Sequence, residues 1–311
     1  MEFQNLPPRV PRRPITSGEH GPVGIVVGVG SPVVSRFRSY DGTQISFRRL
    51  GAGPPLVCLP GGPGRAVEYL GDLGGLARTR QLILVDLRGV GRSADPADPA
   101  TLRVDRLVDD VEALRVHLGL DRMDVLAHSA GAVLATLYAA RYPERLSTLI
   151  LVTPGLAAVG VFGLADAGAV LARSCAEPWF AGASAALAQI RRGDLSVEAF
   201  RASRPLFYGR WDAAARAHAC EGIADRHLAA RVGYFADLTL DVAATTAALR
   251  HLFAPVLLYV GDVDPVVTPA MATEAASSFG SARVVVQPGA GHFPWLDDAA
   301  AFAAAVGSFP G

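Results

Sequence analysis

The chain has 311 residues, of which half are hydrophobic and 19% are charged, so it can bury a large core in one domain or in a core domain with an insertion. Its 29 basic and 29 acidic residues cancel, which argues against nucleic acid or an anionic membrane as a partner. No apolar run approaches the roughly 20 residues that a membrane-spanning helix needs.

Three scattered cysteines, Cys58, Cys175 and Cys220, show no CxxC spacing. An odd and widely spaced set argues against a disulfide framework and against a zinc site. We therefore expect reduced thiols in a cytoplasmic protein, and no bound metal. Residues 1–33 combine arginines, prolines and a short glycine-rich apolar stretch, a pattern more typical of a loosely ordered leader than of a signal peptide.

Strands and helices are expected to alternate from about residue 34 onward. Two strands over 32–40 and 44–49 are joined by a hairpin signal at Asp41-Gly42. Short Val/Leu/Ile runs then predict buried strands at 55–59, 81–85, 123–127, 147–152, 255–260 and 282–286. Apolar spacing predicts helices over 105–118 and 131–141, and an Ala-rich segment predicts a last helix over 297–306. This order indicates an α/β fold with a mostly parallel sheet flanked by helices.

The alternation breaks between residues 155 and 250. This stretch is rich in Ala and Arg, has helical patterning and contains no convincing strand. We expect a helical cap over 155–250, inserted above the C-terminal edge of the sheet. Residues 34–154 and 251–311 would then form the core of the fold.

A candidate nucleophile, Ser129, lies in Ala127-His128-Ser129-Ala130-Gly131, between a predicted strand and a predicted helix. This context is typical of a nucleophile elbow, a sharp turn that presents a serine hydroxyl above the sheet. The helix N-terminus that follows would place positive partial charge near a developing oxyanion. The alternative is a serine that only caps the helix.

Two acids, Asp262 and Asp264, follow the strand predicted over 255–260. The C-terminal end of a strand is where the carboxylate of a catalytic triad belongs. The residue pattern leaves both candidates open, and either can also be an ordinary turn aspartate. The strand over 147–152 continues into Thr-Pro-Gly and offers no carboxylate.

A candidate base, His292, lies in a glycine-rich loop after the last predicted strand. From such a loop, one ring nitrogen can accept the serine proton while the other donates to the carboxylate. The glycines after the strand at 55–59 can aim backbone N–H groups at a carbonyl oxygen. We expect the amides of Gly62 and Ala130 to form an oxyanion hole.

Five motifs occur in one order along the chain: LPGGPG at 59–64, DLRGVGRS at 86–93, AHSAG at 127–131, GDVDP at 261–265 and GAGHFPWLDD at 289–298. Together they resemble the α/β-hydrolase superfamily, and in detail its proline iminopeptidase-like branch. The resemblance covers roughly residues 35–155 and 250–311. It implies the α/β-hydrolase fold, a serine hydrolase activity without a cofactor, and Asp264 as the acid, because that branch carries its acid in G-x-x-D.

Two residues depart from the pattern of that branch. Pro60 stands where the branch has a histidine, and Ala127 stands where it has the first glycine of the elbow. Peptidases of the branch hold the free amino terminus of the substrate with acids of the cap. No motif matches an acid of this chain to that role; the candidates are Glu177, Glu198, Asp212 and Glu221. After the strand at 81–85, we expect Asp86 and Arg88 to brace the loop through hydrogen bonds and a salt bridge.

The leading hypothesis is a serine hydrolase that cleaves an ester or amide, including an N-terminal aminoacyl or prolyl amide, through an acyl-enzyme. Its substrate would be a small molecule or short peptide. One alternative is a biosynthetic hydrolase, cyclase or thioesterase-like enzyme that acts on a natural-product intermediate. Another is a non-catalytic ligand-binding module on the same fold. Aromatic residues expected to line an apolar substrate pocket under the cap are Trp179, Phe207, Tyr208, Trp211 and Trp295.

Overall fold

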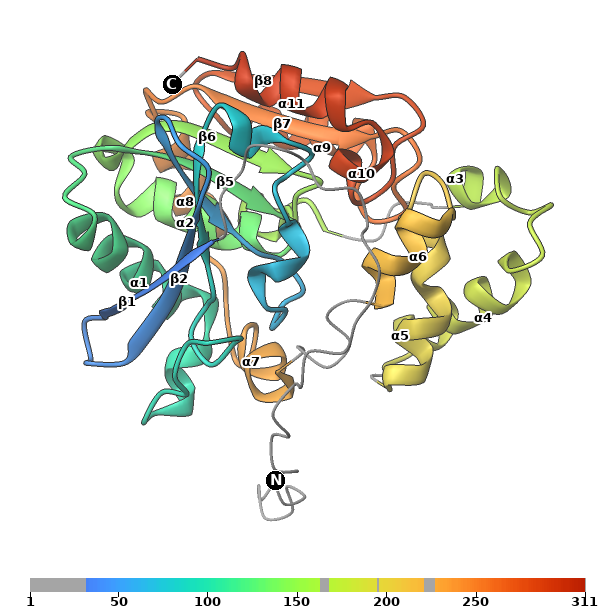
Figure 1. The fold of residues 1–311 in the computed structure, drawn as a ribbon, viewed down its shortest axis with the longest axis horizontal. Coiled ribbons are helices and arrows are strands. Elements are labelled where there is room, and N and C mark those ends of the chain that lie inside the picture. The colour runs from blue at the N-terminus through green and yellow to red at the C-terminus, as the bar shows by residue number, and fades with distance from the viewer. Residues whose placement is uncertain (1–31, 163–167, 195, 221–226, 311) are drawn as a thin grey trace.

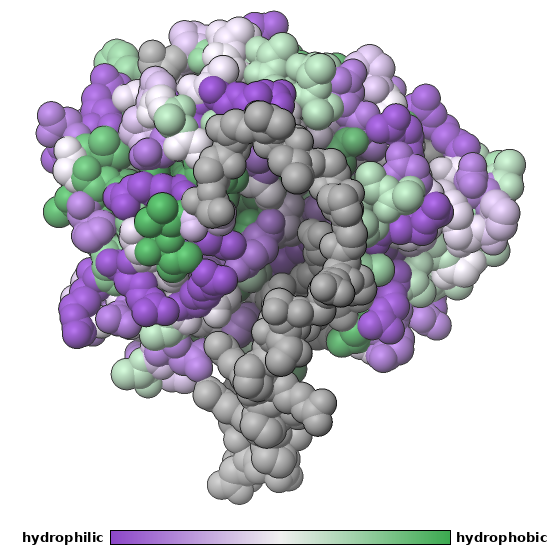
Figure 2. Space-filling view, in the orientation of Figure 1, coloured by the Kyte–Doolittle hydropathy of each residue, from purple (hydrophilic) through white to green (hydrophobic). Residues whose placement is uncertain are grey.

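An eight-stranded sheet runs through the centre of the molecule in the order β1-β2-β4-β3-β5-β6-β7-β8 (Figure 1). The computed structural model describes residues 32–162, 168–194, 196–220 and 227–310, so most of the predicted leader lies outside the described residues. No helix within these ranges is long and apolar enough to cross a membrane. Polar and apolar residues intermingle on the described surface shown in Figure 2.

The strands form at the apolar runs that predicted them. β1 and β2 make the predicted hairpin, and β2 also runs antiparallel to β4, whereas all other neighbouring strands of the sheet are parallel. The predicted α/β fold with a mostly parallel sheet is therefore confirmed. The strands are β1 (Val33–Arg38), β2 (Gln44–Leu50), β3 (Pro55–Leu59), β4 (Gln81–Val85), β5 (Met123–His128), β6 (Leu146–Val152), β7 (Val256–Gly261) and β8 (Ala282–Gln287).

Both faces of the sheet are buried, which explains why the central strands show no polar alternation. Successive side chains of a strand point to opposite faces. In β3, Val57 and Leu59 enter one apolar cluster, while Leu56 and Cys58 enter the other. The first cluster lies against α1 (Val104–His117), α2 (Gly131–Arg141) and α9 (Pro269–Ala276); the second lies against the 3₁₀-helix η1 (Val67–Leu70), α10 (Pro294–Asp297) and α11 (Ala299–Gly307).

Two helices differ from the sequence expectation. The last helix, expected over 297–306, is divided into α10 and α11, because Asp298 is extended and its carboxylate accepts the N–H of Ala301 as an N-cap. Helix α9 had no counterpart among the expected helices. It begins with Thr268 as N-cap and Pro269 in its first turn. This Thr-Pro pair is a typical sequence signal for the start of a helix.

The described helices between residues 155 and 250 fall into two groups. Four of them lie beside the sheet in Figure 1: α3 (Gly168–Ala172), α4 (Phe180–Arg191), α5 (Val197–Ser203) and α6 (Ala213–Cys220). By contrast, α7 (Leu228–Gly233) and α8 (Val242–Leu249) belong to the main core, where Ala230, Tyr234 and Leu249 are buried. As a division of the chain, a cap over 155–250 stays a prediction; we use the word cap below for α3 to α6 and the 3₁₀-helix η6 (Arg204–Phe207).

The side chain of Arg88 is fully buried behind the loop that follows β4. Its guanidinium donates to Asp110 of α1 through Nε (3.0 Å) and Nη2 (2.6 Å), and it also pairs with Asp41 in the hairpin turn. The expected salt bridge therefore forms with these two acids. Asp86 instead accepts two backbone N–H groups at 3.0 Å, from Arg92 of its own loop and from Val67 at the start of η1.

We predict that Arg88→Met lowers the free energy of unfolding by about 3–5 kcal/mol, because it leaves the buried Asp110 carboxylate without its guanidinium. Urea unfolding measures the change. The control is Arg106→Met: this side chain is 59% exposed and only approaches Asp105 at 3.9 Å. The control should shift the free energy of unfolding by less than about 0.5 kcal/mol. A loss below about 1 kcal/mol in Arg88→Met would contradict this account.

Candidate active site

Ser129 occupies a sharp turn between the end of β5 at His128 and the start of α2 at Gly131. Its φ of 53° lies in the left-handed region, which is strained for any residue with a side chain. Three backbone hydrogen bonds hold it there: its N–H donates to Val152 (3.0 Å), and its carbonyl accepts from Ala132 (2.9 Å) and Gly155 (2.8 Å). The turn therefore has the geometry expected of a nucleophile elbow.

Glycines let the loop after β3 approach this turn closely. A Cβ atom on Gly61 would lie 2.7 Å from the Ser129 Cβ and 2.8 Å from the His128 carbonyl oxygen. A Cβ on Gly131 would lie 2.5 Å from the Pro60 carbonyl oxygen. None of these three distances is possible for a Cβ atom, so both positions require glycine for steric reasons.

The structure brings Ser129, His292 and Asp264 into one hydrogen-bonded series. His292 Nε2 lies 2.9 Å from Ser129 Oγ, and His292 Nδ1 lies 2.9 Å from Asp264 Oδ2. A carboxylate can only accept, so Nδ1 carries the proton and Nε2 is free to accept from the serine hydroxyl. Asp264 is fully buried, and its other oxygen accepts the N–H of Val266 at 2.8 Å.

The competing acid, Asp262, faces away from His292. Its Oδ1 accepts the N–H of Gly289 (2.6 Å), and its Oδ2 lies 3.5 Å from Arg173 on the cap side. Of the two acids that the residue pattern left open, the structure places Asp264 and not Asp262 at the histidine.

The two amides expected to form an oxyanion hole lie on either side of the serine turn. The neighbouring Gly61 N–H is already used, since it donates to Tyr69 Oη at 2.7 Å. The N–H groups of Gly62 and Ala130 donate to no acceptor among the described residues. Gly62 lines the cavity at Ser129. Both amides are therefore available to a bound oxygen, and their role stays a prediction.

A buried histidine connects the two loops that flank the serine. His128 Nε2 lies 2.8 Å from the His292 carbonyl oxygen, and because a carbonyl only accepts, the proton is on Nε2. His128 Nδ1 then accepts from Tyr69 Oη at 2.7 Å. Burial, reinforced by the neighbouring His292, holds the pKa of His128 well below its usual value, so the ring is neutral. His128 therefore positions the base and, through Tyr69, the N–H of Gly61.

The cap rests directly on the loop that carries His292. The His292 N–H donates to the Phe207 carbonyl at 2.7 Å. Asp297 Oδ2 accepts N–H groups from both sides of this contact, from Gly209 of the cap segment (3.2 Å) and from Gly291 (2.8 Å). The cap segment thus helps to fix the position of the histidine.

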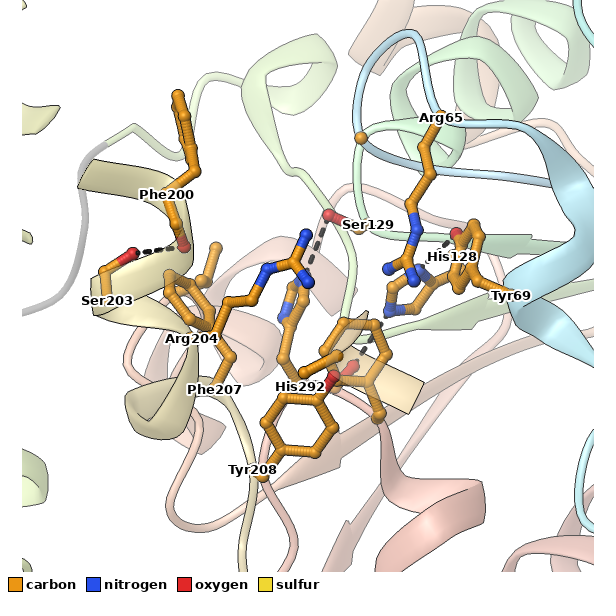
Figure 3. Close-up of a pocket in the computed structure, with 14 residues that line it drawn as sticks. Arg65, Tyr69, His128, Ser129, Phe200, Ser203, Arg204, Phe207, Tyr208 and His292 are labelled. Atoms are coloured by element: carbon orange, nitrogen blue, oxygen red, sulfur yellow. Dashed lines mark hydrogen bonds between the residues drawn. The ribbon is translucent and has the colours of Figure 1, made fainter. Parts of the chain in front are cut away.

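A cavity of about 220 Å³ opens at the serine, between the core loops and the cap (Figure 3). Of the five aromatic residues predicted to line a pocket, Phe207 and Tyr208 do so. Eight further residues line the cavity, and most of them lie outside the sequence motifs: Arg65, Tyr69, Phe200, Ser203, Arg204, Ala219, Val266 and Phe293.

The three tryptophans of the predicted set do not line the cavity at Ser129. Trp295 is 2% exposed and packs edge-on against His128 in the core, because α10 turns it inward. Trp179 and Trp211 line a second cavity of about 540 Å³ on another side of Tyr208. Their Ala-rich surroundings in the sequence do not show which side of the cap they face.

None of the described candidate acids for an amino-terminus site lines the cavity at Ser129. Glu177 and Asp212 line the second cavity, and Glu198 is exposed on α5. Glu221 lies outside the described residues. No acid of the described chain lines the cavity at the serine, and no three described His, Cys, Asp or Glu side chains are grouped as metal ligands would be.

Comparison with known proteins places the chain in a family. The model of the alpha/beta hydrolase fold family matches residues 54–299. The chain is 36% identical over 125 residues to a proline iminopeptidase of Heyndrickxia coagulans and 42% identical over 102 residues to one of Lactobacillus helveticus. These matches cover 39% and 32% of this chain, and 43% and 35% of those enzymes, so the chain aligns with less than half of either relative.

Among solved structures, an esterase from Rhodococcus sp. ECU1013 is similar over nearly the whole fold. It is 25% identical, its TM-score is 0.68, and the match covers 89% of this chain and 98% of the esterase. The chain belongs to the alpha/beta hydrolase fold family. The expected resemblance to proline iminopeptidases is also confirmed, over about a third of the chain.

A second buried histidine fastens the cap to the core. His218 of α6 lies with Nε2 at 2.9 Å from the Tyr69 carbonyl oxygen, so Nε2 donates, while Nδ1 accepts from Tyr208 Oη at 2.8 Å. Burial, with a smaller effect of the Arg65 charge, lowers the pKa of His218 to about 4. The His218 ring is therefore held in its neutral form in the folded protein.

We predict that the contribution of the His218 contacts to the free energy of unfolding decreases as the pH falls from about 6.5 to about 4. The reason is that His218 takes up a proton at higher pH in the unfolded chain than in the folded protein. The contribution is complete above pH 6.5, and its loss amounts to about 3 kcal/mol. Urea unfolding of wild type and His218→Gln at several pH values measures it. The stability advantage of wild type over the variant should shrink on acidification.

The matched control is His251→Gln, which changes an exposed ring outside the cap. An advantage of wild type over His218→Gln that is equal at pH 7 and pH 4.5 would contradict the assignment.

Proposed function

We propose that the chain is a cofactor-independent serine hydrolase that cleaves an ester through an acyl-enzyme. The observation that carries the proposal is the series from Asp264 through His292 to Ser129, with hydrogen bonds of 2.9 Å on both sides of the imidazole. It ends at a hydroxyl that faces a cavity lined by the core and the cap. Family membership and the similar esterase support the same class of reaction.

The geometry supports a two-step reaction. Ser129 Oγ attacks the substrate carbonyl carbon as its proton passes to His292 Nε2. Asp264 stabilises the imidazolium, and the amides of Gly62 and Ala130 would bind the oxyanion. His292 then protonates the leaving group, which departs from the tetrahedral intermediate. A water molecule, activated by the same nitrogen, hydrolyses the acyl-enzyme and restores the serine.

The lining of the cavity favours an ester over an N-terminal aminoacyl or prolyl amide. A free amino terminus needs a carboxylate partner when it leaves water. The described lining contains two arginines, Arg65 and Arg204, and no carboxylate. An ammonium group would therefore meet like charge beside the serine.

We predict that a fluorophosphonate probe labels the wild-type protein and does not label Ser129→Ala. The probe phosphonylates only a serine activated by a neighbouring base, so labelling requires the hydrogen bond to His292. Gel fluorescence measures it, and Ser174→Ala, in the cap, is the matched control that keeps labelling. Absence of labelling in the wild type would contradict the hydrolase proposal and favour a non-catalytic binding module.

We predict that Tyr69→Phe lowers kcat for p-nitrophenyl hexanoate roughly tenfold, the effect of one or two lost hydrogen bonds that position reacting groups. The change removes both the acceptor of Gly61 N–H and the donor to His128. Steady-state kinetics measure it, with thermal unfolding to show that the variant is folded. Tyr142→Phe, whose hydroxyl lies 3.4 Å from Asp109 on a distant helix, is the control and should retain kcat. An unchanged kcat in Tyr69→Phe would exclude this positioning role.

A further inference from the structure

Arg204 begins the 3₁₀-helix η6 and sends its side chain into the cavity at the serine. In Figure 3 its guanidinium points toward the space beside Ser129 and His292. It therefore faces the position that a bound substrate would occupy.

Within the described chain, this guanidinium has no acidic partner. Its Nη1 is buried and makes no hydrogen bond, and none of the ion pairs of the described residues includes Arg204. Burial lowers its pKa, and the ionisable groups that act on it are Tyr208, Cys220 and Arg201, none of them a carboxylate. A buried donor without a partner is costly, and native structures retain few of them.

A second arginine adds positive charge to the opposite wall. Arg65 is 6% exposed, and its guanidinium lies 3.9 Å from the ring centre of Tyr69 and 5.7 Å from that of Phe293. The described lining of the cavity therefore contains two arginines and no acid, in a chain whose formal net charge is zero. An anion bound in this confined space would gain from the charge of Arg204.

We propose that the substrate carries a carboxylate that Arg204 binds while the ester carbonyl lies at Ser129. This inference rests on the proposed hydrolase function and adds the class of substrate. A guanidinium presents paired N–H donors that match the two oxygens of a carboxylate. The remaining walls, which include Phe200 and Phe207, suit a short apolar segment between the carboxylate and the ester.

The test compares ester probes that differ in one terminal group. On the acyl side, the monoester of p-nitrophenol with adipate is compared with p-nitrophenyl hexanoate and with p-nitrophenyl ε-aminohexanoate. On the leaving-group side, meta-carboxyphenyl hexanoate is compared with meta-carbamoylphenyl hexanoate. We expect kcat/KM to be about 10- to 100-fold higher for the carboxylate probe in one of the two arms, the range of a charge-assisted hydrogen bond. The arm that shows the preference identifies the side of the ester that Arg204 binds.

Variants assign the preference to Arg204. The readout is the ratio of kcat/KM for the carboxylate probe to kcat/KM for its neutral partner, so that a general loss of activity cancels. Arg204→Met should reduce the ratio to about 1, and Arg204→Lys, which keeps the charge but not the paired donors, to an intermediate value. Arg201→Met, on the exposed side of α5, should keep the wild-type ratio. If thermal unfolding shows that Arg204→Met does not fold, the Arg204→Lys ratio decides.

Three outcomes overturn the proposal. In the first, the wild type cleaves p-nitrophenyl hexanoate but prefers the carboxylate probe in neither arm. This result excludes the anion site and leaves the hydrolase proposal intact. A preference that persists in Arg204→Met, or is unchanged in Arg204→Lys, assigns the anion to another residue. Failure to cleave any ester, together with absent fluorophosphonate labelling, overturns the proposed hydrolase function and the substrate class with it.

Discussion

The neutral ring of His128 holds together the two loops on which the site depends. Its protonated nitrogen fixes the His292 carbonyl, and its other nitrogen, through the Tyr69 hydroxyl, fixes the amide of Gly61. A second proton on the ring would oppose the Tyr69 hydroxyl with a donor and break this series. Burial keeps that proton away, so the alignment of base and serine rests on a polar group that is stable only while uncharged.

The cap also contacts the residues on either side of His128. The Phe207 carbonyl accepts the N–H of His292, and His218 donates to the Tyr69 carbonyl. The base His292 and the tyrosine that positions His128 are therefore each hydrogen-bonded to the cap. The same segment contributes Arg204 to the cavity wall. One short stretch of chain thus both supports the reacting groups and supplies the charge that we propose selects the substrate.

Much of the fold and part of the candidate site could be predicted from the sequence, because buried strands and a strand-turn-helix serine leave local signals. Asp264 and Asp262 could not be separated by pattern alone, since both follow β7 and only the path of the loop decides which reaches His292. Trp295 was predicted to line the pocket, but it lies in α10 with its side chain buried in the core. Arg204 was missed because an arginine in an Ala- and Arg-rich helical segment looks like any solvated side chain, and its lack of a partner is visible only in three dimensions.

The steric limits at Gly61 and Gly131 bear on how such an enzyme could change its substrate. Side chains cannot be added there without moving the serine turn, so these two positions of the core are closed to gradual variation. The cap half is open to it: Phe200, Ser203 and Ala219 line the cavity without forming any of the hydrogen bonds that align Ser129 and His292. Selection, natural or in the laboratory, therefore has room to alter specificity through the cap while the chemistry of the core stays constant.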